Sequence, residues 1–148
     1  MKIYSNNKKA YYEYEILEKY EGGLVLLGSE VKSIKEGQAS IKESYIRFLD
    51  SELYVIGMYI GEYSNTGYSA HELTRNKKIL INKSEIKKIR KFVDIKGHTL
   101  IPLQLYLKNN FIKLLFACAK SKKLYDKRKE KADRDISRRI NRELKSKS

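Results

Sequence analysis

Few residues in this sequence have the type and spacing that catalysis requires. The two histidines, His71 and His98, lie far apart, and neither has a cysteine or carboxylate at metal-ligand spacing. Glu72 follows His71, but the His-Glu-x-x-His pattern of a zinc-binding helix is not completed. The sequence also has no Gly-x-Ser-x-Gly motif, no Cys-x-x-Cys motif and no glycine-rich phosphate loop. It therefore predicts a protein that is not an enzyme and has no cofactor or metal, although carboxylates that meet only after folding would leave no such trace.

The single cysteine and the N-terminus indicate the compartment. One cysteine, Cys118, excludes an intrachain disulfide, and its place in an apolar run predicts a small buried side chain. Residues 1–9 have no apolar stretch behind their charges, so they do not form a signal peptide. No apolar run reaches the roughly 20 residues that span a bilayer. These features predict a cytoplasmic protein.

A basic charge interleaved with aromatic residues points to a polyanionic partner. The formal net charge is +14, and the 148 residues include twelve tyrosines and four phenylalanines. Such a charge attracts nucleic acid or an anionic membrane surface, and exposed rings can stack on bases while ammonium groups meet phosphates. Alternation along the strand pair 99–119 predicts that Tyr106 and Lys113 point outward. The other lysines expected on a phosphate-reading surface are Lys8, Lys9, Lys32, Lys35, Lys77 and Lys78, although for any one of them an ordinary solvated face is the favoured explanation.

The composition changes near Lys120 and divides the chain in two. Residues 120–148 hold thirteen lysines and arginines against five acidic residues, a net charge of +8, with no glycine or proline. Residues 1–119 mix large apolar side chains with turn residues. We expect a folded, strand-rich domain over 1–119 and a basic C-terminal tail over 120–148.

The tail has one narrow apolar stripe. Leu124, Ala132, Ile136, Ile140 and Leu144 recur at intervals of four or eight residues. A helix with so thin a stripe buries little surface, so the tail is expected to be disordered when free and to fold against a partner. A membrane helix would need a broader apolar face with aromatic residues, and RNA is therefore the better partner.

Local patterns predict the elements of the first domain. Residues 12–20 alternate as a first strand that Glu21, Gly22 and Gly23 would end as a turn. Residues 28–37 read as a short helix with Ser29 as its N-cap and Gly37 after its last turn. Residues 44–49 and 52–59 form an expected hairpin.

The C-terminal half of the domain has clearer patterns. A helix is predicted from Asn82 or Ser84 to about Gly97. Residues 99–119 form an expected hairpin that turns at its two asparagines. The apolar residues expected on one face of this hairpin are Ile101, Leu103, Leu105, Leu107, Ile112, Leu114, Phe116 and Cys118. Pro102 would fit an edge position or the beginning of the strand.

These elements predict a mainly β fold with flanking helices. The preferred architecture is a closed or nearly closed antiparallel barrel of the oligonucleotide-binding (OB) type, which presents a sheet face and loops to RNA. A similar order of predicted strands and helices is also compatible with a ferredoxin-like sheet.

Several separated motifs resemble those of the SmpB family, the protein partners of transfer-messenger RNA. The matching segments occur in the family's order over nearly the whole chain: residues 7–10 (NKKA), 28–34 (GSEVKSI), 43–45 (ESY), His71, Arg75, 78–81 (KILI), 97–103 (GHTLIPL) and 117–128 (ACAKSKKLYDKR). Two positions depart from the family pattern, which usually has proline at Leu73 and glycine at Ser121.

The resemblance implies a function in bacterial ribosome rescue. Such a protein binds the tRNA-like domain of transfer-messenger RNA as a monomer. Elongation factor Tu binds the same RNA, and the complex enters stalled ribosomes. The body residues implied in RNA binding are Asn7, Lys8, Lys9, Glu30, Lys32, Lys35, Leu80 and Lys113. The implied tail residues, which would occupy the empty decoding centre and mRNA channel in helical form, are Lys120, Lys122, Lys123, Tyr125, Asp126, Lys127 and Arg128.

Two of these assignments have weaker support from physical chemistry. The Glu30 carboxylate is not attracted to phosphate, so it would contact a base edge or a 2′-hydroxyl, or else brace the fold. Leu80 taken alone would be assigned to the core. A ribosomal protein with a basic extension and an RNA-processing enzyme remain as competing hypotheses.

Overall fold

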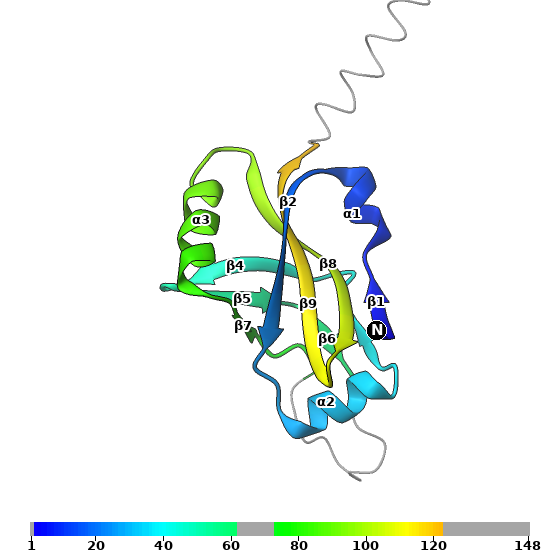
Figure 1. Cartoon of the computed structure of the whole chain (residues 1–148). Helices are drawn as coiled ribbons and strands as arrows, with labels where there is room; N and C mark the ends of the chain where they lie inside the picture. The colour runs from blue at the N-terminus through cyan, green and yellow to red at the C-terminus, as the bar shows by residue number, and fades with distance from the viewer. Residues whose placement is uncertain (1, 62–72, 123–148) are drawn as a thin grey trace, which may run out of the picture.

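Antiparallel strands dominate the computed structural model, which describes residues 2–61 and 73–122 (Figure 1). Its helices are α1 (Lys8–Glu13), α2 (Gly28–Lys35) and α3 (Lys83–Val93). Its strands are β1 (Lys2–Asn6), β2 (Tyr14–Leu24), β3 (Ala39–Ser40), β4 (Tyr45–Leu49), β5 (Glu52–Ile56), β6 (Tyr59–Ile60), β7 (Lys77–Leu80), β8 (His98–Lys108) and β9 (Phe111–Ser121).

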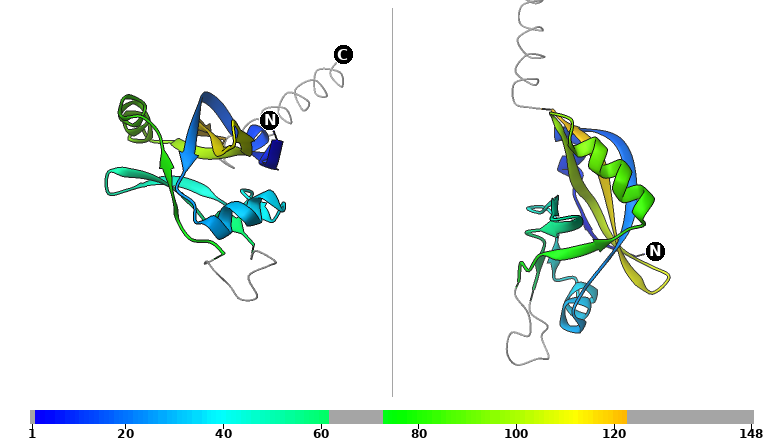
Figure 2. Two further views of the ribbon diagram at one scale, coloured as in Figure 1. Left: turned by 60° about the horizontal axis from the view of Figure 1, so that its bottom comes forward. Right: turned by 90° about the vertical axis from the view of Figure 1, so that its left-hand side faces the viewer.

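Six strands form a nearly closed barrel. Hydrogen-bonded neighbours follow the order β8–β4–β5–β7–β2–β9, and β9 pairs again with β8, while β1 adds to β8. The β4–β8 contact is short, with Ile46 opposite Leu100, so the ring is not continuous there. The views in Figure 2 show α3 on the outside of the strands. The predicted mainly β fold with an OB-like barrel and flanking helices is confirmed.

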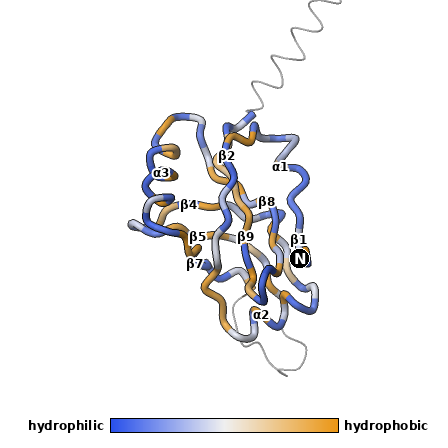
Figure 3. Tube along the Cα trace, in the orientation of Figure 1, coloured by the Kyte–Doolittle hydropathy of each residue, from blue (hydrophilic) through white to orange (hydrophobic). Residues whose placement is uncertain are grey.

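The barrel interior holds the main core. Leu105 of β8 and Leu114 and Phe116 of β9 are fully buried there, together with Ile34 of α2 and Ile89 of α3. Figure 3 shows hydrophobic residues on the central strands and hydrophilic residues along the outer side of α3. Burying the apolar stripes of α2 and α3 attaches both helices to the barrel.

Both predicted hairpins are present, although the second strand of the first ends at Ile56 and Tyr59 belongs to β6, which pairs with β3. β4 and β5 pair through Asp50, which has a φ of 58°. β8 and β9 join at Asn109 and Asn110, whose φ values of 51° and 66° are those of a tight hairpin turn. Asparagine tolerates this left-handed conformation better than most residues, which explains the pair at the turn.

The predicted single apolar face of the long hairpin is wrong. The β8–β9 register shifts between Pro102 and Gln104. Leu105 therefore points into the barrel, whereas Ile101 and Leu103 pack on the other face in a second cluster that includes Ala10 of α1. A one-residue shift in a strand reverses the faces of all later side chains, and a smooth alternation could not reveal it.

Pro102 lies inside β8 rather than at an edge or at the strand's beginning. Its carbonyl accepts a hydrogen bond of 2.9 Å from Asn7 Nδ2, on the β1 side of the strand. Pro102 lies at the register shift of β8, and a β-bulge is one of the places where a strand tolerates proline.

The prediction for the N-terminal strand is wrong in its boundaries. β1 comes first, Tyr12 belongs to α1, and β2 continues through Gly22 and Gly23 to Leu24. Gly23 is paired with Lys113 on one side and Leu80 on the other. Pairing on both sides holds this segment extended, which overrides the turn preference of two glycines.

The two predicted helices are present. In α3, the Asn82 side chain accepts a hydrogen bond of 2.9 Å from the Glu85 N–H, so Asn82 is the N-cap. In α2, Ser29 lies within the helix and is not its cap, because the N-cap position is Leu27. Gly37 follows α2 with a φ of 82°, as expected after a last helical turn.

Candidate nucleic-acid interface

Gly22 and Gly23 allow β2 to approach β7 closely. A Cβ on Gly22 would lie 2.6 Å from Ile79 Cγ2, too near for any side chain. A Cβ on Gly23 would meet Leu80 Cβ at 3.6 Å and Lys113 Nζ at 3.9 Å. The missing side chain at Gly23 therefore leaves Leu80 and Lys113 side by side above the strand. Sequence reasoning missed this glycine because the pair was interpreted as a turn.

Leu80, Phe111 and Lys113 form an exposed surface around Gly23, the Gly23 patch. The exposed fractions of Leu80 and Phe111 are 51% and 67%. The Lys113 ammonium lies 5.9 Å from the Phe111 ring centroid. A shallow hollow beside them is lined by Val31 of α2, among other residues. Apolar side chains, a ring and an ammonium group together suit a base or sugar next to a phosphate.

The structure thus brings together two residues predicted from the resemblance, Leu80 and Lys113. Leu80 is half exposed, although its side chain alone suggested a core residue. It sits at the end of β7, where alternation turns it away from the buried Ile79.

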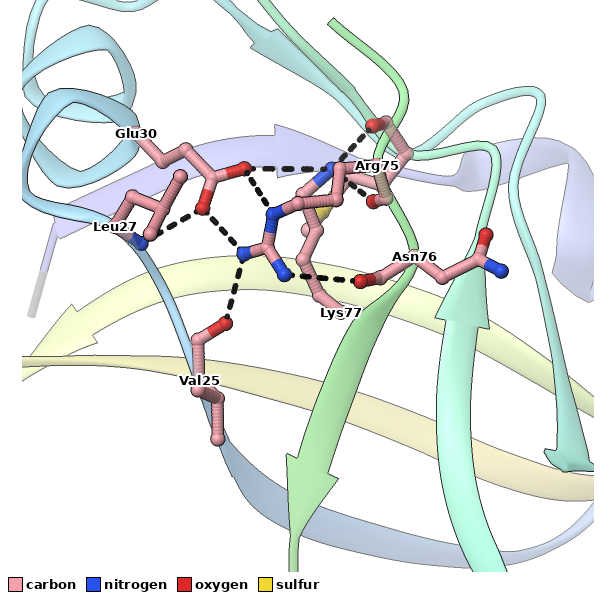
Figure 4. Close-up of polar contacts among 7 residues, drawn as sticks. Val25, Leu27, Glu30, Arg75, Asn76 and Lys77 are labelled. Atoms are coloured by element: carbon pink, nitrogen blue, oxygen red, sulfur yellow. Dashed lines mark hydrogen bonds and ion pairs between the residues drawn. The ribbon is translucent and has the colours of Figure 1, made fainter. Parts of the chain in front are cut away.

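Glu30 lies inside the fold, where it joins α2 to the segment before β7 (Figure 4). Its Oε1 accepts a 2.6 Å hydrogen bond from Arg75 Nη2 and one of 2.7 Å from the Leu27 N–H. Its Oε2 accepts a 3.3 Å bond from Arg75 Nε and lies 3.9 Å from Lys77 Nζ. Arg75 Nη2 also donates to the Val25 carbonyl at 3.2 Å.

Burial by itself raises the pKa of the Glu30 carboxyl, but the hydrogen bonds and positive charges around it lower that pKa by more. Hydrogen bonds from Arg75 and the Leu27 N–H, together with the charges of Arg75 and Lys77, bring the pKa of the Glu30 carboxyl below its ordinary value. Burial lowers the pKa of the Lys77 amine to about 8, with Glu30 opposing this shift and Arg75 adding to it. Glu30 is therefore the counter-ion of two cations inside the protein.

This arrangement favours the interpretation of Glu30 as a brace of the fold. Both carboxylate oxygens are engaged internally, and the side chain is fully buried. It braces the fold, so any effect on RNA must pass through the position of α2 and Arg75. Lys77 is fully buried as well and donates to the Met58 and Arg75 carbonyls, so the prediction that it lines a phosphate-reading surface is wrong.

The remaining basic residues of the body differ in exposure. Lys32 and Lys35 are exposed on α2, and Lys8 and Lys9 are exposed at the start of α1. Asn7 is buried instead. The Asn7 side chain donates a hydrogen bond to the Pro102 carbonyl, and its backbone N–H donates to the Leu103 carbonyl at 2.9 Å. These bonds attach the start of α1 to β8.

Lys78 and Tyr106 make contacts within the protein. Lys78 is partly exposed and pairs with Glu52 at 3.0 Å. Tyr106 is buried, and its hydroxyl donates to the Glu21 carboxylate. Tyr106 lies opposite Lys113, on the face away from the core that contains Leu105, so the predicted face is correct, but its side chain is buried and is not available at the surface. The Tyr106 hydrogen bond is the main cause of a lowered pKa at Glu21.

The first residues of the predicted tail continue the body. Lys120 belongs to β9, which ends at Ser121, and the Lys122 N–H donates to the Glu13 carbonyl at 3.0 Å. Lys120 and Lys122 are both exposed. The other predicted tail residues lie outside the described residues: Lys123, Tyr125, Asp126, Lys127 and Arg128.

Possible reactive groups are few in the described part of the chain. Residues 2–61 and 73–122 contain no cluster of three or more His, Cys, Asp or Glu side chains that would hold a metal ion. His98 stacks on Phe92 with ring centroids 4.0 Å apart. Cys118 is buried, as predicted, and burial raises the pKa of its thiol to about 11. Among the helices of these same residues, none is long and apolar enough to cross a membrane.

The fold and the Gly23 patch define a class of protein. A small, nearly closed antiparallel barrel with exposed lysines and rings is typical of oligonucleotide-binding folds. The model of the SmpB protein family matches residues 4–146, and the chain belongs to that family.

Relatives and a solved structure agree with this assignment. A protein of Solidesulfovibrio magneticus named "SsrA-binding protein" is 46% identical over 97% of this chain and 93% of its own length. A protein of the same name from Fusobacterium nucleatum is 44% identical over 97% of both chains. A chain in a solved structure described as "tmRNA-SmpB: a journey to the center of the bacterial ribosome" is 38% identical, with a TM-score of 0.66 over 80% of this chain and 84% of its own.

Proposed function

We propose that this protein binds SsrA RNA, the transfer-messenger RNA, and delivers it to stalled ribosomes in trans-translation. The observation that carries the proposal is the near full-length match to proteins named for SsrA binding. The protein works by binding and not by catalysis, in the cytoplasm, and reaches elongation factor Tu through the shared RNA.

The Gly23 patch is the proposed contact of the body with the tRNA-like domain. Lys113 supplies a charge for a phosphate, while Leu80 and Phe111 supply apolar surface for a sugar or base. Lys32 and Lys35 extend the positive surface along α2, whose Val31 borders the same hollow. Glu30 acts as a positioning residue, because it fixes α2 and Arg75 next to this surface.

Shape and charge make separable contributions to this binding. Each phosphate contact steepens the dependence of log affinity on log salt by about 0.7 to 0.9. Contacts of Leu80 and Phe111 depend little on salt. The specific RNA should therefore be preferred over unrelated RNA at every salt concentration.

A double substitution at the patch tests this contact. Leu80→Ala with Lys113→Met should weaken binding to SsrA RNA at least tenfold and lower the salt slope by about 0.8. A matched control is Leu17→Ala with Lys19→Met, which removes an exposed leucine and an exposed lysine from β2. Equal affinities of the two double variants for SsrA RNA would show that the patch does not contact it.

The tail is proposed to occupy the mRNA channel and decoding centre of the stalled ribosome. The truncation is placed after Lys122, because β9 runs to Ser121 and the Lys122 N–H donates to the Glu13 carbonyl. We expect a chain ending at Lys122 to bind SsrA RNA as the full chain does but to fail in a reconstituted rescue reaction. Loss of RNA binding in this truncated chain would contradict the division between body and tail.

Sequencing the RNA that co-purifies with the protein tests the whole proposal. SsrA RNA should be strongly enriched over other small RNAs. A structural ribosomal protein would instead co-sediment with ribosomes that lack SsrA RNA, in the same stoichiometry as other ribosomal proteins. An RNA-processing enzyme would cleave labelled RNA with time, with or without divalent metal.

A further inference from the structure

The Lys113 side chain has two very different neighbours across the sheet. Lys113 of β9 lies opposite Tyr106 of β8 on one side and opposite Gly23 of β2 on the other. Figure 1 shows β9 between these two strands. Directly opposed residues project from the same face of a sheet, so Tyr106 fills the β8 side of Lys113, whereas Gly23 leaves the β2 side open.

The Tyr106 side chain reaches beyond Lys113 to β2. Its hydroxyl donates to Glu21 Oε2, and Glu21 lies opposite Leu115 of β9. The Tyr106 side chain therefore crosses β9 diagonally, from the position of Lys113 toward that of Leu115. A buried tyrosine hydroxyl needs a hydrogen-bond partner, and the Glu21 carboxylate supplies it from two strands away.

The Glu21 carboxylate is occupied by side chains of β8. Besides the Tyr106 hydroxyl, Lys108 Nζ lies 3.4 Å from each of its oxygens. The Tyr106 hydrogen bond is the main cause of the lowered pKa of Glu21, and the charges of Lys108 and Lys113 add to it. Lys113 is therefore near enough to act on Glu21, yet in residues 2–61 and 73–122 it takes part in no ion pair.

The Lys113 ammonium is directed over Gly23 instead. Its Nζ lies 3.9 Å from the position that a Cβ on Gly23 would take, and 5.9 Å from the Phe111 ring centroid. An ammonium group with no carboxylate partner binds a phosphate without first breaking an ion pair. A nearby carboxylate that lost its own partner would compete with the phosphate for this ammonium, because opposite charges attract most strongly at short distances.

We propose that Tyr106 and Glu21 are positioning residues, which keep the Lys113 ammonium unpaired and directed over Gly23 for a phosphate of SsrA RNA. The inference rests on the proposed function, in which Lys113 contacts that RNA. Tyr106 acts by occupying the carboxylate that would otherwise pair with Lys113. Glu21 acts by anchoring the ring that borders Lys113 on its β8 side.

The test removes one hydroxyl group from the full-length protein. Tyr106→Phe keeps the ring and frees one oxygen of the Glu21 carboxylate. Its matched control is Tyr54→Phe, because the Tyr54 hydroxyl also donates to a glutamate, Glu52, at 3.3 Å, and that glutamate is also paired with a lysine. The affinity for SsrA RNA is measured from 0.1 to 0.3 M salt for both variants and for the unchanged protein.

Loss of one phosphate contact should weaken binding of SsrA RNA to the Tyr106→Phe variant roughly sixfold at 0.1 M salt and reduce the salt slope by about 0.8. The Tyr54→Phe control should keep both values. Adding Glu21→Gln to Tyr106→Phe removes the competing charge and should restore most of the slope, which a merely loosened sheet would not regain. In a Lys113→Met background, Tyr106→Phe should change neither value further, because the residue through which it acts is gone.

Three results would overturn the inference. Equal affinities of the Tyr106→Phe and Tyr54→Phe variants would show that the Tyr106 hydroxyl does not control Lys113. Weakening of the same size in the Lys113→Met background would show that the effect bypasses Lys113. Failure of Glu21→Gln to restore any of the slope would assign the loss to a structural defect. Failure of the proposed function has a separate sign, which is that the unchanged protein shows no preference for SsrA RNA over an unrelated RNA of equal length.

Discussion

Lys77 carries its ammonium group inside the protein, and this should be visible as a pH-dependent stability. Its Nζ donates to the Arg75 carbonyl at 2.6 Å and to the Met58 carbonyl at 3.1 Å, with Glu30 as the nearby counter-ion. Lys77→Met removes the charge and keeps an unbranched side chain of similar length. We expect this substitution to change how the free energy of unfolding depends on pH.

The direction follows from the two pKa values of the amine. Burial lowers the pKa of Lys77 from 10.5 to about 8 in the folded protein. Between these values the unfolded chain binds more protons than the folded one, so the free energy of unfolding rises with pH. From about pH 7 to pH 9.5, this difference contributes about 2 kcal/mol. Above pH 10.5 no further gain from Lys77 remains.

Urea unfolding followed by circular dichroism at pH 7 and pH 9.5 measures the effect. The unchanged protein should gain about 2 kcal/mol more than the Lys77→Met variant between the two pH values. Lys78→Met, which removes a partly exposed neighbour paired with Glu52, is the control and should keep the gain. Other titrating groups are common to all three proteins and cancel. The same pH dependence in the unchanged protein and the Lys77→Met variant would refute the reasoning.

Three substitutions and one thiol reaction test the surrounding structure. Glu30→Gln leaves the buried Lys77 and the partly exposed Arg75 without their counter-ion and should cost about 3 kcal/mol of unfolding free energy at pH 7, measured by urea titration; a loss below about 1 kcal/mol would contradict the brace. Gly22→Ala should cost about 1–3 kcal/mol because its Cβ would overlap Ile79, whereas Gly23→Ala should cost less than about 1 kcal/mol; equal losses would argue against the close β2–β7 approach. The Cys118 thiol, buried and with a pKa raised to about 11, should react with a disulfide reagent at pH 8 only as fast as the protein unfolds, and immediate labelling would contradict its burial.

Local sequence signals predicted the helices and hairpins whose formation depends on residues close together in the sequence. The asparagine pair at 109 and 110, between two alternating runs, predicts the long hairpin, because turn conformation and alternation are local properties. Asn82 and the apolar spacing after it predict α3 in the same way. The resemblance to a family added residues, such as Leu80, that pattern alone would have assigned to the core.

Long-range pairing decided what local signals got wrong. Gly22 and Gly23 lie within β2 because β9 pairs with both and β7 pairs with Gly23 on the other side, and neither partner is a sequence neighbour. Tyr106 is buried because β2 supplies Glu21 across the sheet. A register shift near Pro102 reverses the faces of β8, and it places Ile101 and Leu103 in the cluster that contains Ala10 of α1.

The sequence by itself determined the chemical character of this protein: an excess of positive charge, aromatic rings among lysines, and no recognisable catalytic motif. Those properties depend on composition and spacing, which folding does not alter. The tertiary structure alone decided which charges reach the surface. Lys77 and Lys113 are the same residue type, yet one is enclosed beside Glu30 and the other is held next to Leu80 above Gly23. The difference arises because strands that are distant in the sequence pair to form one barrel. The neighbours of each lysine depend on which strands pair beside it.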